Sequence, residues 1–291
     1  MSLLLGLIGH PVKHSLSPAM HRAALNYYGL AGEYRLVDLA PEELRAGLRS
    51  LIAERFAGFN VTVPHKQAIF ALVQENSNQA RALGAVNTVK VNHGEGELFG
   101  HNTDLEGFTT ALSEAMPEQF TSRAACVIGS GGAARAALWG LARLGFRELL
   151  VVSRNPAAAQ ALVRDFEHHH KRPGRPSLRL MGIENTHPVP RLGLVVNSTP
   201  IGLNDEAAPD WALRLLKQTD GAGLCFDMVY ARSERPTSFV SAARDLGLTG
   251  LDGTEMLVQQ AALSFSYWTG KKGPVEVMRQ ALWECRRGGP G

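Results

Sequence analysis

The chain has 291 residues, enough for one large domain or two ordinary ones with a buried core. Hydrophobic residues make up 45% of it and charged residues 20%, which is typical of a soluble globular protein. Its net charge of +3 is too small to indicate nucleic acid as a partner, although it suits ligands that carry phosphate.

Membrane and disulfide-rich classes are also disfavoured. No apolar run approaches the length that crosses a bilayer, and the apolar start over 3–8 lacks the flanks of a signal peptide. The three cysteines, Cys126, Cys225 and Cys285, have neither metal-ligand nor redox spacing. We therefore expect a cytoplasmic protein with no membrane partner and no metal.

The first predicted strand, 3–8, runs into a loop that carries two serines. Ser17 is a good N-cap for the following helix, and Pro18 suits its first position. Ser15 lies two residues earlier, after a strand end, where ligands of open α/β sheets gather. Two hydroxyls beside a helix N-terminus suit a carboxylate, although capping alone explains Ser17 equally well.

Two charged residues then follow predicted strands. A strand over 59–63 ends at Pro64, and Lys66 falls in the first turn of the next helix, where a cation faces the positive helix end. Such a locally disfavoured charge suggests function, although solvation at the surface also accounts for it. Asp104 occupies a similar strand-to-helix junction in the same layer.

A hairpin over 85–91 and 97–101 leads to that junction, and its turn contains two glycines. Thr103 and Glu106 have the spacing of a capping box, which explains Thr103 structurally. The pattern gives Asp104 no such explanation, so Asp104 is a candidate functional residue.

The second half of the chain begins with a glycine-rich turn. Gly129-Ser-Gly-Gly-Ala-Ala134 lies between an apolar strand over 125–128 and an Ala-rich helix over 133–144. This spacing matches the dinucleotide-binding pattern, in which small residues let the backbone approach a pyrophosphate at the helix N-terminus. Alone, the pattern is weak.

The next predicted strand, 148–153, strengthens the cofactor interpretation. It ends at Ser153-Arg154-Asn155, about 20 residues after the glycines, where this fold contacts the adenosine ribose. An acidic residue there would bind a ribose 2′-hydroxyl, whereas Arg154 pairs well with a 2′-phosphate. The sequence therefore favours NADP over NAD.

Further strands are expected at 194–197, 224–228 and 248–251, and helices at 255–268 and 274–285. The predicted fold is α/β and two-lobed: residues 1–116 and 254–291 form a substrate domain, and 117–253 an inserted Rossmann-like domain that binds NADP. The C-terminal helices return to the first lobe, and the active site is expected in the cleft between the lobes.

Eight motifs follow one another along the chain: Gly9-His-Pro-Val-Lys-His-Ser-Leu-Ser-Pro18, Asn60-Val-Thr-Val-Pro-His-Lys66, Gly84-Ala-Val-Asn-Thr88, Gly100-His-Asn-Thr-Asp104, Gly129-Ser-Gly-Gly-Ala133, Asn197-Ser-Thr-Pro-Ile-Gly202, Asp227-Met-Val-Tyr230 and Gly253-Thr-Glu-Met-Leu-Val-Gln-Gln-Ala261. Together they resemble the motifs of the shikimate dehydrogenase family, and the resemblance covers essentially the whole chain. The resemblance implies reversible NADPH-dependent reduction of 3-dehydroshikimate to shikimate, a step of aromatic amino-acid (chorismate) biosynthesis.

The resemblance also implies residue roles. Lys66 and Asp104 would be the catalytic pair. The substrate would be held by Ser15, Ser17, Asn60, Thr62, Asn87, Tyr230 and Gln260. The cofactor would be bound by Gly129, Ser130, Gly131, Gly132, Ala133, Ser153, Arg154 and Asn155, with Met228 and Gly253 bordering the nicotinamide.

The chain departs from the family at the predicted 2′-phosphate site. The family often has Asn-Arg-Thr there, and many relatives add a second basic residue a few positions on, where this chain has Ala158. A single arginine predicts a preference for NADP that need not be strong.

Several alternatives stay open at this stage. A quinate/shikimate dehydrogenase that uses NAD differs through pocket shape, which a sequence does not reveal. A non-catalytic NADP-binding regulator would not need both Lys66 and Asp104, and a folate-linked dehydrogenase would leave Ser15 and Ser17 unexplained. The chain is expected to act as a monomer or homodimer, and the His-rich segment 168–176 is interpreted as a surface loop.

Overall fold

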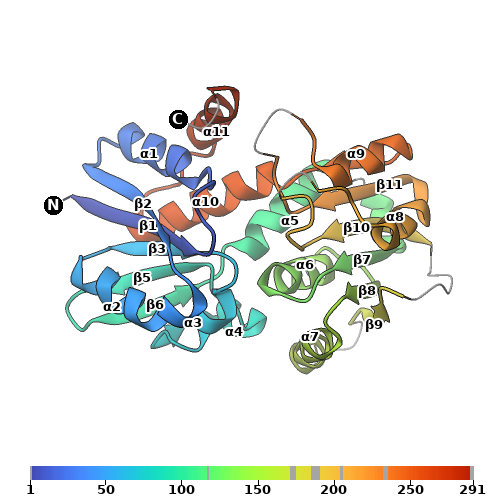
Figure 1. Cartoon of the computed structure of the whole chain (residues 1–291), viewed down its shortest axis with the longest axis horizontal. Helices are drawn as coiled ribbons and strands as arrows, with labels where there is room; N and C mark the ends of the chain where they lie inside the picture. Colours follow the sequence, from blue (N-terminus) through green and yellow to red (C-terminus); the bar gives the residue numbers. More distant parts are fainter. Residues whose placement is uncertain are drawn as a thin grey trace. The chain divides into compact units, whose positions relative to one another are not determined.

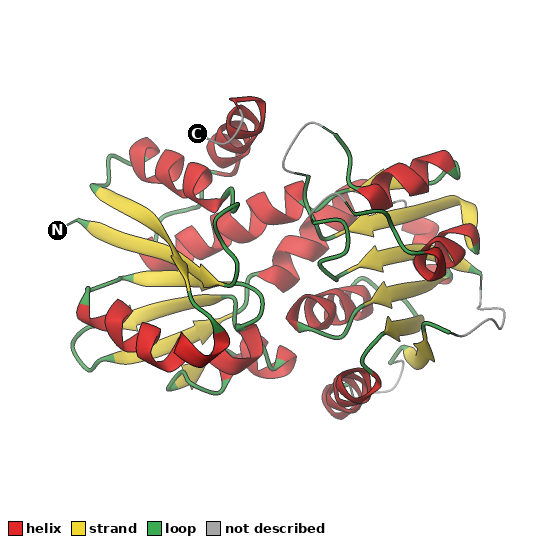
Figure 2. Cartoon of the chain, in the orientation of Figure 1, coloured by secondary structure: helices red, strands yellow, loops and turns green. Residues whose placement is uncertain are grey.

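The computed structural model describes residues 2–116, 118–170, 175–184, 191–203, 206–231 and 235–288. It divides into two compact units: unit 1 comprises Met1–Gly107 and Val258–Gly291, and unit 2 comprises Phe108–Leu257. Each unit interleaves strands with helices, as Figure 1 and Figure 2 show. The predicted α/β class is confirmed, whereas the domain boundaries at 116/117 and 253/254 stay a prediction.

Unit 1 is built on a mixed six-stranded sheet. Its strands are β1 (Leu3–Gly9), β2 (Gly32–Asp38), β3 (Gly58–Val61), β4 (Glu75–Asn76), β5 (Thr88–Asn92) and β6 (Glu97–His101), in the order β2-β1-β3-β5-β6-β4. Strand β1 pairs in parallel with β2 and β3, and β5 pairs antiparallel with β3 and β6. The predicted hairpin is therefore confirmed, and the carboxyl ends of β1 and β3 lie at the same edge.

Helices pack on this sheet through apolar side chains. They are α1 (Ser17–Tyr27), the 3-10 turn η1 (Pro41–Glu43), α2 (Leu44–Ala53), α3 (Lys66–Phe70), α4 (Asn78–Leu83), α10 (Thr254–Thr269) and α11 (Val275–Gly288). Leu44, Leu48 and Leu51 recur on one face of α2 and join the core formed with Phe59 and Val61. Helix α10 begins in unit 2 and ends in unit 1.

Helix α1 starts one residue earlier than predicted. Leu16 is the N-cap, and Ser17 is the first helical residue, buried, with no side-chain capping bond from the cap position. The acceptor for the backbone N–H of Ser17 is instead the hydroxyl of Ser15, at 3.2 Å. The prediction of Ser17 as N-cap was therefore wrong, because the loop places Ser15 where it satisfies the first helical donor.

Unit 2 contains a six-stranded sheet in which every pairing is parallel. Its strands are β7 (Ala124–Ile128), β8 (Glu148–Ser153), β9 (Ser177–Gly182), β10 (Leu192–Asn197), β11 (Thr219–Asp227) and β12 (Thr249–Leu251), in the order β12-β11-β10-β7-β8-β9. Counted within the unit, this is the doubly wound order 3-2-1-4-5-6 of dinucleotide-binding folds. The strand order reverses between β7 and β10, and ligands of such sheets bind outside the carboxyl ends at that point.

The helices of unit 2 are α5 (Asp104–Ala115, which begins in unit 1), the 3-10 turn η2 (Glu118–Ser122), α6 (Gly132–Arg143), α7 (Pro156–His169), α8 (Asp210–Lys217) and α9 (Ser238–Asp245). Strands β7 and β10 are buried along their whole length, as parallel strands covered on both faces require. Gly145, just after α6, has a φ of +97°, which a residue with a side chain rarely adopts.

Part of the His-rich segment continues a helix. Helix α7 extends to His169, and the ring of His170 stacks on Phe166 with centroids 4.1 Å apart. The surface-loop prediction is therefore wrong for 168–169, and it is untested at residues 171–174, which lie outside the described part of the chain. Among the described residues, no cluster of three or more His, Cys, Asp or Glu side chains could hold a metal ion, and no helix has the length and apolarity to cross a membrane.

The sheets end in short or charged edge strands. In unit 1, β4 has two residues and β2 carries the exposed Glu33 and Arg35. In unit 2, β12 has three residues and β9 carries the exposed Arg179.

Candidate active site

Lys66 and Asp104 form an ion pair in unit 1. The Nζ atom of Lys66 lies 2.7 Å from Oδ2 of Asp104, although the two residues are 38 positions apart. Lys66 begins α3 and Asp104 begins α5, each after a short loop that follows a strand, β3 and β6 respectively. Their side chains are 15% and 6% exposed, so the Lys66 ammonium keeps some access to solvent while the carboxylate is enclosed.

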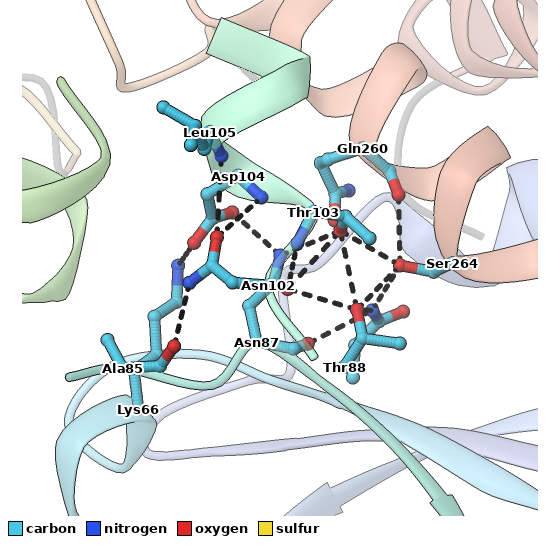
Figure 3. Close-up of polar contacts among 11 residues, drawn as sticks. Lys66, Ala85, Asn87, Thr88, Asn102, Thr103, Asp104, Leu105, Gln260 and Ser264 are labelled. Atoms are coloured by element: carbon cyan, nitrogen blue, oxygen red, sulfur yellow. Dashed lines mark hydrogen bonds and ion pairs between the residues drawn. The ribbon is translucent and has the colours of Figure 1, made fainter. Parts of the chain in front are cut away.

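The other carboxylate oxygen is held by Asn87. Its Nδ2 donates to Oδ1 of Asp104 at 2.8 Å, and its Oδ1 accepts from the backbone N–H of Thr103 at 2.7 Å. Figure 3 shows Lys66 and Asn87 approaching Asp104 from different directions. With one donor on each oxygen, the carboxylate is fixed in orientation and remains an acceptor.

Asn102 fixes the start of α5, a role that sequence reasoning missed. Its Oδ1 accepts from the backbone N–H groups of Asp104 and Leu105 at 3.0 and 3.3 Å. Its Nδ2 donates to the carbonyl of Ala85 at 3.0 Å. The side chain of Thr103, interpreted from sequence as a cap, also bonds to Asn87.

Three buried hydroxyls meet next to Asn87. Those of Thr88 and Ser264 are 2.8 Å apart, those of Thr103 and Ser264 3.1 Å, and those of Thr88 and Thr103 3.3 Å. Ser264 also donates to the carbonyl of Gln260, one turn earlier in α10, at 2.9 Å. The cluster in Figure 3 thus joins α10 to the start of β5 and the start of α5.

Asn60, at the end of β3, connects to this cluster and to β2. Its Nδ2 lies 2.9 Å from the Ser264 hydroxyl and 3.2 Å from that of Thr88. Its Oδ1 accepts from the hydroxyl of Tyr34 at 2.8 Å. Both polar atoms of this buried amide therefore have partners within unit 1.

The predicted serine pair lies after β1 of the same unit. The Ser15 hydroxyl donates to that of Ser17 at 3.1 Å. Asp38 braces the loop before them, because it accepts from the backbone N–H of Val12 at 3.3 Å and contacts the ring of His10 at 2.5 Å. Thr62 lies at the neighbouring carboxyl end, just after β3, and is partly exposed.

The glycine-rich turn follows β7 in unit 2. Gly129 has a φ of +121°, and a Cβ there would lie 2.5 Å from the Ser198 hydroxyl, which bonds to the Ile128 carbonyl at 2.6 Å. Gly131 is the N-cap of α6, and a Cβ there would meet no atom within 4 Å. The first glycine is required by the turn itself, whereas the space at Gly131 is open for a ligand at the helix N-terminus.

The other predicted cofactor residues surround this turn. The hydroxyls of Ser130 and Ser153 are 3.0 Å apart and link the ends of β7 and β8. Arg154 is exposed directly after β8, so its guanidinium is accessible to a phosphate. The side chain of Asn155 caps α7 by accepting from the backbone N–H of Ala158 at 3.0 Å, while Gly132 and Ala133 form the first turn of α6.

Met228 and Gly253, predicted to border the nicotinamide, are in contact. A Cβ on Gly253 would lie 2.4 Å from the carbonyl oxygen of Met228, so only glycine fits there. The backbone N–H of Met228 donates to the carbonyl of Asn197 at 2.9 Å. Tyr230, the one predicted substrate residue in unit 2, follows two positions after Met228 and is partly exposed.

Asp227, which sequence reasoning gave no role, is buried at the carboxyl end of β11. It accepts from Nδ2 of Asn197 at 2.8 Å, the hydroxyl of Thr237 at 2.6 Å and the N–H of Val229 at 3.1 Å. Burial raises its pKa from the ordinary 3.8 to about 7, and these hydrogen bonds offset part of the rise. The carboxyl group ties together the segments after β10 and β11.

Asp227 should make stability depend on pH. Because the pKa of Asp227 is raised in the folded state, that state binds the proton more tightly than the unfolded state does. The stabilisation that comes from this proton is therefore complete below about pH 4 and is lost progressively as the pH rises to about 7. Asp227→Asn is uncharged throughout. The Tm difference, wild type minus Asp227→Asn, should therefore fall between pH 4 and 7 in thermal melts and then level off. Asp245→Asn, which removes an exposed carboxyl group from α9 of the same unit, is the control. A flat line for Asp227→Asn would contradict the assignment.

Comparisons with known proteins point to one family. Residues 7–89 match the model of the shikimate dehydrogenase substrate binding domain, and residues 253–282 that of the shikimate 5'-dehydrogenase C-terminal domain. The chain is 39% identical over 286 residues to shikimate dehydrogenase (NADP(+)) of Trichormus variabilis, and the aligned residues cover 96% of this chain and 95% of that protein.

Solved structures agree over the full length. Shikimate 5-dehydrogenase from Thermus thermophilus, in complex with NADP(H) and shikimate, is 36% identical with a TM-score of 0.78, over 97% of this chain and 99% of that one. Quinate dehydrogenase from Corynebacterium glutamicum, in complex with NAD, is 32% identical with a TM-score of 0.83, over 97% and 99%.

Proposed function

Because the chain belongs to the shikimate dehydrogenase family, we propose that it catalyses the reversible NADPH-dependent reduction of 3-dehydroshikimate to shikimate in aromatic amino-acid biosynthesis. The observation that carries this proposal is the Lys66–Asp104 pair, with 2.7 Å between Nζ and Oδ2. A regulator that only bound the cofactor would have no use for an enclosed carboxylate beside an accessible ammonium.

The pair suits carbonyl reduction. NADPH, when bound, supplies the hydride that reaches the carbonyl carbon. The Lys66 ammonium stabilises the negative charge that develops on the oxygen and donates the proton to it. Asp104 holds the Lys66 Nζ in place and accepts from the neighbouring substrate hydroxyl, while Asn87 keeps the carboxylate oriented. In the oxidation direction, Lys66 in its neutral form takes the proton back.

The remaining polar residues bind and orient the substrate in this proposal. The adjacent hydroxyls of Ser15 and Ser17 bind its carboxylate, helped by the N-terminus of α1. The ring hydroxyls are held by Thr62, Asn87, Tyr230 and Gln260, with Asn60 beside them. Orientation by several polar groups matters because hydride transfer requires close alignment of the reacting atoms.

The residues of unit 2 fit NADP. The open space at Gly131 and the start of α6 suit the pyrophosphate, and the exposed Arg154 suits the 2′-phosphate. The contact between Met228 and Gly253 forms a surface for the nicotinamide end. Free cysteines, of which Cys126 and Cys225 are buried, agree with the proposed cytoplasmic location.

Arg154→Ala should separate the two cofactors. We expect the KM for NADPH to rise by about tenfold, as when a hydrogen bond to a charged group is lost, while the KM for NADH changes little because NADH lacks the 2′-phosphate. Steady-state kinetics with both cofactors measure this. Arg164→Ala is the matched control, because it removes the same charge from an exposed position in α7, ten residues after Arg154 and about 15 Å away along the helix direction. It should change neither KM. Equal rises for both cofactors would remove the argument.

The proposed reaction itself is tested by oxidation of shikimate and of quinate, each with NADP and with NAD. The highest kcat/KM is expected for shikimate with NADP. A preference for quinate with NAD would indicate the specificity named for the C. glutamicum structure, and no turnover of either acid would indicate a non-catalytic protein. Gel filtration on the same samples tests whether the enzyme is a monomer or a homodimer.

A further inference from the structure

We propose that Tyr34 is a positioning residue that acts on Asp104 through a directional chain of hydrogen bonds. The chain runs from the Tyr34 hydroxyl through Asn60, Thr88 and Asn87, and ends at the carboxylate. The proposal rests on the function proposed above for Asp104. Tyr34 belongs to none of the sequence motifs that indicated a site, so only the folded structure reveals its contact with Asn60.

The orientation of the Asn60 amide follows from its neighbours. Its Nδ2 lies 3.2 Å from the backbone carbonyl of Asn87, a group that can only accept. The amino group must therefore face Asn87, and Oδ1 must face β2. There it accepts from the Tyr34 hydroxyl at 2.8 Å. The direction of this first link is thus fixed without any assumption about protons.

The orientation of the Asn87 amide is fixed from the other side. The backbone N–H of Thr103 can only donate, and it lies 2.7 Å from Oδ1 of Asn87. Nδ2 of Asn87 must therefore face Asp104, at 2.8 Å from Oδ1. Lys66 occupies the other carboxylate oxygen at 2.7 Å.

Thr88 joins the two amides. Its hydroxyl lies 3.2 Å from Nδ2 of Asn60, which donates, and 3.0 Å from Oδ1 of Asn87, which accepts. The hydroxyl can accept from the first and donate to the second, although its one proton also has the Ser264 hydroxyl within reach at 2.8 Å. With the Thr88 proton on the Asn87 side, the donors point in one direction from Tyr34 to Asp104. Chains of this kind strengthen their members, because each bond polarises the next.

The ring of Tyr34 is held firmly enough to anchor such a chain. It is buried and stacks on His21, with centroids 4.3 Å apart and planes 5° apart. Trp268 packs on the same pair and donates from Nε1 to the carbonyl of Val89 at 2.8 Å. Burial lowers the pKa of His21 to about 3, so the stacked ring stays neutral.

The first test is Tyr34→Phe, which removes one oxygen and leaves the stacked ring. The Oδ1 atom of the buried Asn60 then loses the Tyr34 hydroxyl, which donates to it at 2.8 Å, and the amide can shift. We expect kcat for shikimate oxidation to fall about tenfold while the KM for NADP stays within twofold. Tyr28→Phe is the matched control, because it removes a tyrosine hydroxyl bond of the same unit, to the exposed Lys272 carbonyl; its kcat should stay unchanged. A kcat for Tyr34→Phe within twofold of wild type overturns the proposal.

A double-mutant cycle shows whether the effect passes through the chain. Thr88→Val keeps the side-chain shape but breaks the second and third links, the bonds of Thr88 to Asn60 and to Asn87. If the chain carries the effect, Tyr34→Phe should lower kcat by less than twofold in the Thr88→Val background. Asn60→Asp, which replaces the amino donor with an acceptor, provides a second cycle if Thr88→Val folds poorly. Full additivity in a folded double variant overturns the proposal.

A third measurement does not depend on turnover. In the wild type, the side-chain amide protons of Asn60 and Asn87 should give sharp, separate NMR signals, since both amides are fixed. Tyr34→Phe should shift or broaden both pairs, and Tyr28→Phe neither. Unchanged Asn87 signals in Tyr34→Phe would contradict the proposal, even if the enzyme is active. Shifted signals in a protein that oxidises neither shikimate nor quinate would support the hydrogen-bond chain and contradict the proposed function.

Discussion

Lys66→Ala should lower kcat for shikimate oxidation by about 100-fold or more, the usual contribution of a positioned proton-transfer group. The KM for shikimate should change much less, because the ammonium acts mainly on charge that develops in the transition state. The Asp104 carboxylate is enclosed, and the variant leaves it without its cation, so the free energy of unfolding should fall as well. Thermal melts alongside steady-state kinetics separate the two effects.

The matched control is Lys90→Ala, which removes an exposed lysine from β5 of the same unit. It should leave both kcat and Tm close to those of the wild type. A near-normal kcat for a folded Lys66→Ala protein would refute the catalytic assignment, whatever happened to its stability.

The two glycines of the cofactor turn should respond in opposite ways to the same change. Gly129→Ala places a Cβ 2.5 Å from a bonded serine hydroxyl at a φ of +121°, so we expect it to destabilise unit 2 by about 2 kcal/mol or more. Gly131→Ala has an ordinary φ of −85° and open space, so its Tm should match the wild type. Its affinity for NADPH should nevertheless fall about tenfold, because the added methyl group keeps the pyrophosphate from the backbone donors.

Calorimetric titration with NADPH and thermal melts of both variants measure this contrast. The Gly131→Ala result is the informative one, since its affinity for NADPH should fall while its Tm stays unchanged. Unchanged affinity there would place the pyrophosphate elsewhere, and a loss of Tm equal to that of Gly129→Ala would show that the turn requires both glycines for structural reasons alone.

The sequence predicted the elements well where the pattern was local. The glycine turn, the strand end before Arg154 and the junctions that carry Lys66 and Asp104 are all defined by a few consecutive residues, and the structure places Lys66 and Asp104 together. The start of α1 was missed because Ser15 and Ser17 are both good capping residues, and only the loop geometry selects Ser15.

The hydroxyl cluster could not be predicted in the same way. Thr88 and Ser264 are 176 residues apart, and a single hydroxyl carries no periodic signal. Ser264 follows Gln260 by one helical turn, which places both on one face of α10 and was the one available hint. Asp227 was likewise hidden, because a carboxylate in a buried strand is recognisable only through its donors from other segments.

The edges of the two sheets bear on how copies of this enzyme meet. Continuous intermolecular sheets form when unpaired backbone groups of one margin line up with those of another. Here β4 and β12 offer two and three residues to such a partner, while the longer β2 and β9 would bring arginine and glutamate side chains against a neighbour. Fibre-like stacking through the strand edges is thereby discouraged at the margins of the described sheets.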